Sequence, residues 1–132
     1  LLPIQCEYYA LEGVTQLMRT IEAVRHAMNK ELRLGSILMT MFDGRTRLST
    51  QVDEEVRTHF ARETMSTRIP RSVRVSEAPS YSRSVLTYEP TSAGAVAYRE
   101  AAAEFAKRHA CDEHSTNTSD VKHPDASDTK KG

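Results

Sequence analysis

Hydrophobic and polar residues follow one another in patterns that predict alternating strands and helices. The first run, LLPIQ at 1–5, is typical of the end of a buried strand, with Pro3 limiting its pairing. Apolar residues at helical spacing then predict an amphipathic helix that closes near Asn29: Val14, Leu17, Met18, Ile21, Val24 and Met28. The near-continuous apolar run LRLGSILMTMF at 32–42 predicts a strand covered on both faces.

The middle of the chain continues this alternation. The segment DGRTRLS at 43–49 is predicted to be a loop because Asp-Gly favours turns. Ser49 is then expected to cap a second helix, whose inward face repeats every four residues: Val52, Val56 and Phe60. The segment STRIP at 66–70 predicts a third, short strand that Pro70 ends.

The last third of the chain divides into a loop, a helix and a tail. Residues 71–90 are predicted to form a structured loop anchored by Val85 and Leu86. A final helix is expected from 93 to about 108, facing inward through Tyr98, Ala102 and Phe105. From Cys111 onward the composition is too polar to bury a core. The sequence therefore predicts one domain, 1–110, and a disordered polar tail, 111–132.

The order strand, helix, strand, helix, strand, helix predicts an α/β layered fold with a mostly parallel sheet and flanking helices. Ligands of such sheets bind beyond the carboxyl ends of the strands. Three segments are expected to meet there: QCE at 5–7, TMFDGRT at 40–46 and PRSVRVSEAP at 70–79. We therefore predict a binding site at this edge, although its position alone does not name the ligand.

Charge is balanced overall but distributed unevenly. The chain has 18 basic and 18 acidic residues, whereas residues 45–83 hold eight arginines and no lysine against five acidic residues, a net charge of +3. Guanidinium groups favour phosphate or carboxylate partners, and a solvated charged surface is the alternative. No apolar run is long enough to span a membrane, and no signal peptide is seen. Two distant cysteines favour a reducing cytoplasm.

Four blocks of the sequence together resemble one known family. The blocks are PIQCEYYALEGV, LMTMFDGRTRLSTQVDEEVR, IPRSVRVSEAPSYSRSV and YEPTSAGAVAYREAAAEFAKR. In this order they are similar to the C-terminal half of the ParA/Soj chromosome- and plasmid-partitioning ATPases, relatives of MinD. The resemblance covers residues 1 to about 108. It implies an incomplete P-loop NTPase-like fold.

A characteristic element of that family is not found in this sequence. The family carries a deviant Walker A loop rich in glycine and lysine, which holds phosphates. The glycines of this chain fall in no such loop: Gly13, Gly35, Gly44, Gly94 and Gly132. The resemblance implies ATP and Mg²⁺ as cofactors of the intact family, whereas this portion alone is expected to bind neither and to be inactive. We predict no catalytic and no metal-ligating residue in it, and whether it counts as an enzyme stays open.

The resemblance also implies which residues face the nucleotide. In the family, the adenine base lies between the loop after the second strand of this chain and the loop with the IPR motif. This points to Thr40 and Met41 on one side and to Pro70 and Arg71 on the other. The alternatives are core packing for Met41 and simple strand termination for Pro70.

A second role concerns DNA. The family binds DNA without sequence preference as an ATP-bound homodimer, and its arginines match Arg45 and Arg74 here, with Arg47 a further candidate. Phosphate contacts of this kind set affinity rather than sequence and depend strongly on salt. The alternative is a surface ion pair, for example between Arg74 and Glu77.

Two functions therefore follow from the sequence. In the first, implied by the resemblance, the chain is the C-terminal portion of a ParA-type ATPase in the cytoplasm, associated with the nucleoid. Its expected partners are non-specific DNA, a second copy of itself and a ParB-type protein, and no membrane is involved. The second is a truncated, non-catalytic interaction module that cannot bind ATP and acts at a ParA-type dimer surface.

Overall fold

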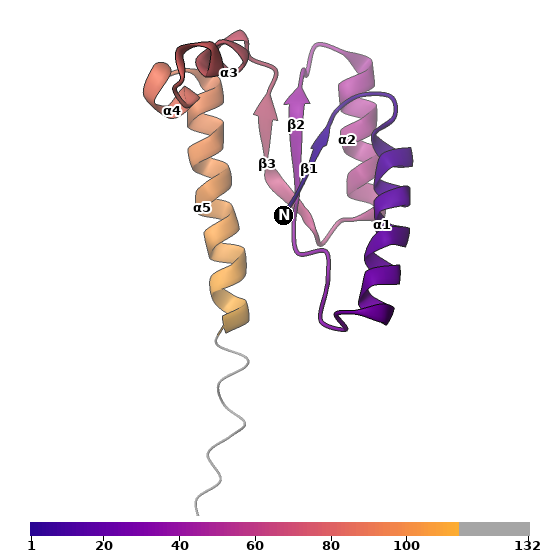
Figure 1. Ribbon diagram of the computed structural model, residues 1–132. Coiled ribbons are helices and arrows are strands. Elements are labelled where there is room, and N and C mark those ends of the chain that lie inside the picture. Colours follow the sequence, from indigo (N-terminus) through magenta and orange to yellow (C-terminus); the bar gives the residue numbers. More distant parts are fainter. Residues whose placement is uncertain (114–132) are drawn as a thin grey trace, which may run out of the picture.

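The computed structural model describes residues 1–113 as a parallel sheet between helices (Figure 1). The elements, in chain order, are β1 (Leu2–Gln5), α1 (Ala10–Ala27), β2 (Ile37–Phe42), α2 (Arg47–His59), β3 (Thr64–Pro70), α3 (Val73–Glu77), the 3₁₀ helix η1 (Ala78–Tyr81), α4 (Val85–Tyr88) and α5 (Ala93–Glu113). The predicted α/β fold with a parallel sheet is confirmed. None of the helices within residues 1–113 is long and apolar enough to cross a membrane.

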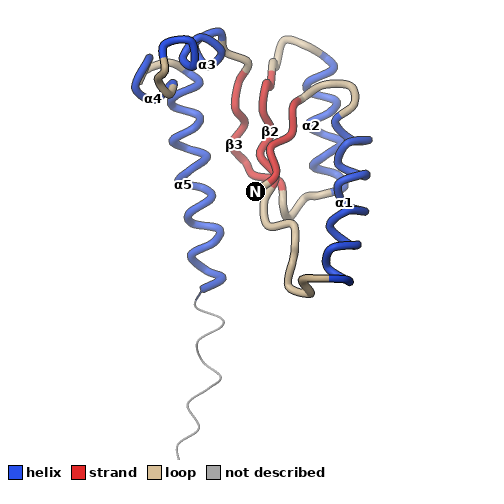
Figure 2. The backbone as a smooth tube through the Cα atoms, in the orientation of Figure 1, coloured by secondary structure: helices blue, strands red, loops and turns tan. Residues whose placement is uncertain are grey.

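The three strands pair in the order β1-β2-β3, and both pairs are parallel. Helices α1 and α2 cover one face of the sheet, and α5 covers the other face beside β3 (Figure 2). All three strands end on the side of the molecule where α3 and α4 lie (Figure 1). This side carries the loops in which the sequence places the site.

The core consists of one layer on each face of the sheet and a small third cluster. The layer under α1 and α2 is built around Ile37, Met39 and Val56, all fully buried. The layer under α5 contains Leu38, Met65, Ile69, Ala97 and Ala101. Because β2 contributes residues to both layers, its apolar run is nearly continuous, as the sequence predicted.

Helix α5 also closes the outer edge of β3. The pairing of β2 with β3 is irregular between Ile37 and Met39, and on β3 this interval contains Ser66 and Thr67. The Glu104 carboxylate accepts hydrogen bonds from the backbone N–H groups of Ser66 at 2.7 Å and Thr67 at 2.8 Å, and from the Thr67 hydroxyl at 2.8 Å. A charged side chain thus satisfies amides of an edge strand that would otherwise be open to pairing.

Helix α2 begins earlier than predicted. Thr46, not Ser49, is the N-cap residue, since its side chain accepts a hydrogen bond from the Ser49 N–H at 3.4 Å. Arg47 therefore lies in the first turn of the helix rather than in a loop. Both hydroxyl residues suit a cap. Ser49 instead turns inward, is 5% exposed, and hydrogen-bonds to the Cys6 carbonyl at 3.4 Å.

The segment 71–90 is more helical than predicted, because three short helices occupy most of it. The predicted anchor Val85 is confirmed, since it is 8% exposed and packs with Ala78 and Ala95. The second predicted anchor was wrong, because Leu86 is 40% exposed. Short helices held by such contacts leave little periodicity in the sequence.

Several predicted boundaries and faces also shift. Residues 32–36 join no strand, so β2 covers only the second half of the predicted run. Met28 follows the end of α1 and is 84% exposed, contrary to prediction. On α5 the predicted inward residue Ala102 is exposed, and its neighbour Ala101 is buried instead. The helix continues to Glu113, and the rest of the predicted tail, 114–132, lies outside the described residues.

Candidate functional site

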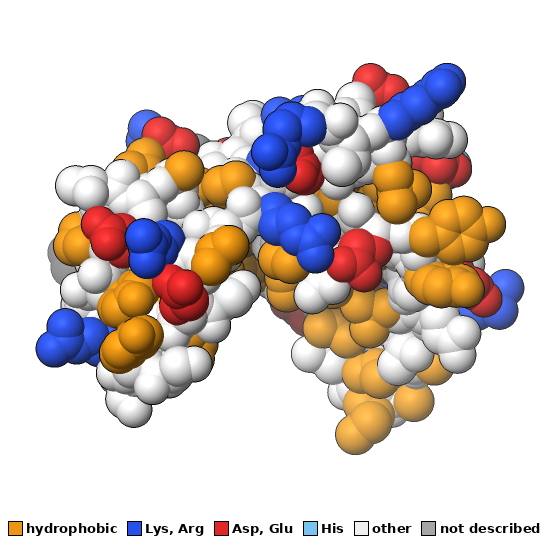
Figure 3. Space-filling model, turned by 90° about the horizontal axis from the view of Figure 1, so that it is seen from above, with side chains coloured by type: hydrophobic (Ala, Val, Ile, Leu, Met, Phe, Trp, Pro, Cys, Tyr) orange, Lys and Arg blue, Asp and Glu red, His pale blue; other side chains and the backbone are white. Residues whose placement is uncertain are grey.

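The carboxyl ends of the three strands form the face that carries the candidate site. Seen from above, arginine and lysine side chains gather over the middle of this face (Figure 3). The face is hollowed on one side, where hydrophobic side chains line the gap between the part that carries α5 and the part that carries α1 (Figure 3). Residues of all three predicted segments, among them Gln5, Met41 and Arg71, line one pocket here, so the prediction that these segments meet at one edge is confirmed.

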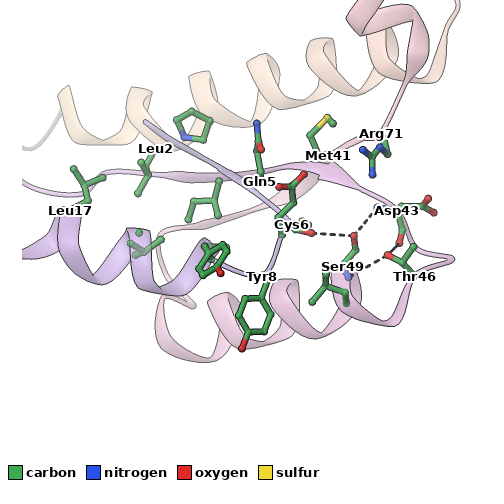
Figure 4. A pocket seen from close by; sticks show the side chains of 18 residues that line it. Leu2, Gln5, Cys6, Tyr8, Leu17, Met41, Asp43, Thr46, Ser49 and Arg71 are labelled. Atoms are coloured by element: carbon green, nitrogen blue, oxygen red, sulfur yellow. Dashed lines mark hydrogen bonds between the residues drawn. The ribbon is translucent and has the colours of Figure 1, made fainter.

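A pocket of about 830 Å³ opens at this edge. Its walls come from β1, the start of α1 and the loop between β2 and α2, and Met41 and Arg71 complete it. Figure 4 shows Met41 beside Arg71 at one end, with Gln5 and Asp43 next to them. Apolar side chains thus form most of the wall and a few polar groups meet at one end, which is the usual construction of a small-molecule site.

Met41 has an unusual backbone conformation. Its φ angle is +56°, in the left-handed region that residues other than glycine rarely adopt. The β2–β3 register is irregular between Met39 and Phe42, where three residue steps on β2 oppose two on β3. Met41 lies in this bulge, and bulges next to binding sites commonly redirect a side chain. The left-handed conformation therefore occurs at the residue whose side chain the bulge directs into the pocket wall.

Of the four residues predicted to face a nucleotide, Met41 and Arg71 share the pocket. Thr40 and Pro70 do not line it. The Thr40 hydroxyl donates a hydrogen bond to the Ile4 carbonyl at 3.0 Å, which ties β2 to β1. Pro70 lies opposite Phe42 at the end of the β2–β3 pairing, and the N–H of Arg71 donates to the Phe42 carbonyl at 2.9 Å.

The three arginines predicted to contact DNA are all exposed around the same edge. The Arg45 side chain is 90% exposed and that of Arg74 is 55% exposed. Arg47 begins α2. Arg74 Nη1 donates to Glu77 Oε2 at 3.1 Å, so the surface ion pair weighed above is present. An exposed pair of this kind leaves the guanidinium open to other anions.

Arg68, in contrast, pairs with a buried side chain. Its Nη2 atom donates to Asp53 Oδ2 at 2.7 Å, and its guanidinium lies 5.3 Å from the centre of the Phe42 ring. Burial by itself raises the pKa of Asp53, but hydrogen bonds from Arg68 and Arg57 outweigh it and lower that pKa. Arg68 is thus committed to an internal carboxylate.

Sequence reasoning missed the role of Asp43. Its carboxylate accepts hydrogen bonds from Arg45 Nε at 3.0 Å and from Arg45 Nη2 at 2.9 Å, and it also lines the pocket with Arg71. Hydrogen bonds from Arg45, with a smaller contribution from the charge of Arg71, lower the pKa of Asp43 to about 2. The Asp-Gly pair signalled only a turn. The spacing Asp43-x-Arg45 was the signal that could have revealed the ion pair.

Cys6 lies in the wall of the pocket but is 3% exposed. Burial, and then the negative charge of Asp53, raise the pKa of its thiol to about 11. The thiol is therefore protonated at neutral pH, and its nucleophilic form is scarce. Cys6 serves as a packing residue of the pocket wall.

Comparison with known proteins identifies the class of this fold. A family model described as an AAA domain matches residues 1–34. Together with the parallel sheet and its flanking helices, this match defines a P-loop NTPase-like α/β fold.

Sequence relatives then narrow the class. The chain is 51% identical over 106 residues to the chromosome-partitioning ATPase Soj of Thermus thermophilus, 50% identical over 106 residues to the chromosome partitioning protein ParA of Caulobacter vibrioides, and 47% identical over 105 residues to the sporulation initiation inhibitor protein Soj of Bacillus subtilis. Each alignment covers 80% of this chain, but only 43%, 40% and 42% of the respective relative. The chain therefore belongs, over the part that aligns, to the ParA/Soj family of chromosome-partitioning proteins.

Proposed function

We propose that this chain forms the DNA-contacting and nucleotide-base side of a ParA/Soj-type partitioning ATPase. One observation carries the proposal: the exposed arginines Arg45, in the loop after β2, and Arg74, on α3, lie at the sheet edge that also holds the pocket of Met41 and Arg71. The chain spans less than half the length of these relatives, so the activity of a whole partitioning ATPase is part of the proposal.

The DNA contact is assigned to Arg45 and Arg74, with Arg47 beside them. Their side chains are exposed, and a guanidinium group offers paired donors to phosphate oxygens. Contacts of this kind read the DNA backbone and not the bases. Binding should therefore be independent of sequence and should weaken steeply as salt rises.

The nucleotide contact is assigned to Met41 and Arg71. A thioether side chain suits the flat face of a base, and the Arg71 guanidinium supplies hydrogen-bond donors at the same end of the pocket. Thr40 and Pro70 would support this end indirectly, by fixing the strand ends from which Met41 and Arg71 project.

The pocket suits the base of ATP better than its phosphates. Phosphates in this fold class are held by a glycine- and lysine-rich loop, and the sequence given contains no such loop. We therefore assign neither ATP hydrolysis nor Mg²⁺ binding to residues of this chain. Dimerisation with ATP, a ParB-type partner and a position on the nucleoid belong to the proposal for the intact protein, supported by the partitioning role in the relatives' names.

The test compares two short DNA duplexes of equal length and unrelated sequence in fluorescence anisotropy titrations with the 132-residue chain. Equal affinities for both duplexes are expected. A strong preference for one duplex would contradict backbone recognition. No binding at low salt by a chain with native circular dichroism would instead favour the non-catalytic interaction module.

A further inference from the structure

Asp43 holds Arg45, whose side chain is 90% exposed at the site. Its Oδ1 atom accepts hydrogen bonds from the backbone N–H of Arg45 at 3.1 Å and from Arg45 Nε at 3.0 Å, and its Oδ2 atom accepts one from Arg45 Nη2 at 2.9 Å. The two side-chain bonds form a fork between carboxylate and guanidinium. A DNA phosphate that approached the Nε and Nη2 side of the guanidinium would use the same two donors, so both anions cannot form this fork with Arg45 at once.

The two partners differ in how firmly they are placed. The Asp43 side chain is 16% exposed, and its backbone is fixed by the first turn of α2. Its N–H donates to Ser49 Oγ at 3.3 Å, and its carbonyl accepts from the Thr46 hydroxyl at 2.9 Å. The Arg45 side chain, by contrast, is 90% exposed. Asp43 is therefore a fixed acceptor, and Arg45 is a long side chain in solvent that can exchange partners.

A second cation compensates Asp43 when Arg45 leaves. Asp43 and Arg71 line the same pocket, and the charge of Arg71 acts on the Asp43 carboxyl in addition to that of Arg45. Releasing Arg45 therefore leaves the carboxylate beside a remaining positive charge. Arg74, at the same edge, is held less completely, since one hydrogen bond of 3.1 Å joins its guanidinium to Glu77.

We propose that Asp43 is an internal competitor of DNA: its carboxylate occupies the Arg45 guanidinium in the free protein and is displaced by a phosphate, and so it restrains DNA affinity at this edge. This proposal rests on the proposed DNA contact of Arg45. Because an exposed ion pair is weak, a phosphate can displace Asp43, but the exchange lowers the affinity that a free Arg45 would give. Asp43 is therefore a positioning residue and need not touch DNA itself.

The test measures the affinity of the full 132-residue chain for a short DNA duplex at low salt, in four proteins: wild type, Asp43→Asn, Arg45→Ala and the double variant. Asparagine keeps a side-chain oxygen but loses the charge that holds the fork. We expect Asp43→Asn to bind roughly two- to fivefold more tightly than wild type. In the Arg45→Ala background the same change should have no effect, because there is no guanidinium to release. Glu54→Gln is the matched control. It removes an exposed negative charge at another position, on α2, and should leave the affinity unchanged.

The outcomes separate the two proposals. If Arg45→Ala weakens binding but Asp43→Asn does not tighten it, the competitor role is wrong and the DNA contact stands. The competitor role is also overturned if Asp43→Asn increases the DNA affinity in the Arg45→Ala background, or if Glu54→Gln increases the affinity as much as Asp43→Asn does. Either result would show that negative charge repels DNA in general. If Arg45→Ala binds as well as wild type, or no protein binds, both proposals fail.

A measurement on the wild-type chain covers the case in which Asp43→Asn does not fold. The Nε–H resonance of Arg45 should shift during a DNA titration, as its acceptor changes from carboxylate to phosphate. The Nε–H of Arg68, which donates to Asp53 Oδ2 at 2.9 Å, serves as the internal control and should not move. An Arg45 resonance that stays in place at saturating DNA would overturn the proposal.

Discussion

The carboxylate of Asp53 on α2 lies 2.7 Å from the Nη2 atom of Arg68 on β3. The Asp53 side chain is 4% exposed and that of Arg68 is 38% exposed, so a buried carboxylate pairs with a partly exposed guanidinium and joins the helix to the last strand. Arg57, one turn further along α2, donates to the same carboxylate oxygen at 3.0 Å. The pair thereby fixes the strand from which Arg71 continues into the pocket.

Removing one partner of this pair should destabilise the fold. We expect Asp53→Ala to lower the free energy of unfolding by about 2–3 kcal/mol, because it leaves two arginines without their buried acceptor. Urea denaturation followed by circular dichroism measures the change. In the double variant Asp53→Leu with Arg68→Leu, hydrophobic packing replaces the pair, and most of the loss should be recovered. A double variant that is as unstable as Asp53→Ala, or less stable, would contradict this account.

The conformation of Met41 makes a separate prediction about stability. A β-branched side chain tolerates a positive φ poorly, whereas asparagine adopts this region readily. Met41→Val should therefore lower the free energy of unfolding by about 1–2 kcal/mol relative to Met41→Asn. Urea denaturation of the two variants tests the difference directly. Equal stability, or a more stable valine variant, would show that the left-handed conformation of Met41 is not adopted in solution.

The proposed contact with the nucleotide base can be tested through methionine methyl groups. The chain has five methionines, of which Met39 and Met65 are fully buried and serve as internal controls. In a titration of the methyl-labelled chain with adenosine, the Met41 resonance should shift while those of Met39 and Met65 stay in place, because only Met41 lines the pocket. Uniform shifts, or none at saturating adenosine, would remove Met41 from the proposed base site.

Acid should release the contact between α5 and β3. Burial by itself disfavours the charged form of Glu104, but hydrogen bonds from Ser66 and Thr67 and the charge of Arg108 outweigh it and lower its pKa from 4.5 to about 2. A group whose pKa is lowered by folding stabilises the fold above its unfolded value, and this contribution is lost as pH falls towards the folded value. The stabilisation is therefore complete above pH 4.5 and declines down to about pH 2.

Glu104→Gln isolates this effect. At neutral pH the variant should be less stable by about 1–3 kcal/mol, because glutamine accepts the amide hydrogen bonds more weakly and removes the ion-pair partner of Arg108. The difference from wild type should narrow as the pH falls below 4.5 in a series of urea denaturations. A difference that is constant with pH would show that the loss is steric and does not come from the carboxylate.

The sequence predicted the elements whose periodicity is long or whose apolar run is buried. Helices α1 and α2 belong to this class because each repeats a hydrophobic pattern over several residues. Strand β2 belongs to it because its apolar run is nearly continuous, and the alternation of strands and helices then predicted the parallel sheet. Helices α3 and α4 were missed, since four or five residues show no period and Val85 is held by contacts with α5 that only the fold creates.

The candidate site was predictable in its position and in the local pair of Arg74 with Glu77, but not in which arginine pairs with a buried carboxylate. The parallel fold places the ends of β2 and β3 together, so the meeting of Met41 and Arg71 followed from topology and family resemblance. The partner of Arg68 did not. Arg45 has its partner Asp43 two residues away in the sequence, whereas Arg68 pairs with Asp53, 15 residues away, and that pairing depends on side-chain directions that only the folded structure provides.

The most direct test of the central claim is the salt dependence of DNA binding by the full chain, with Arg45→Ala and Arg74→Ala beside it. Arg25→Ala is the matched control, because Arg25 lies in the last turn of α1, away from the carboxyl ends of the strands (Figure 1). We expect affinity to fall steeply with salt, and each edge variant to bind more weakly with a salt slope smaller by about one. The control should behave like wild type. Equal losses in all three variants, or binding that does not change with salt, would contradict the assignment of this edge to DNA.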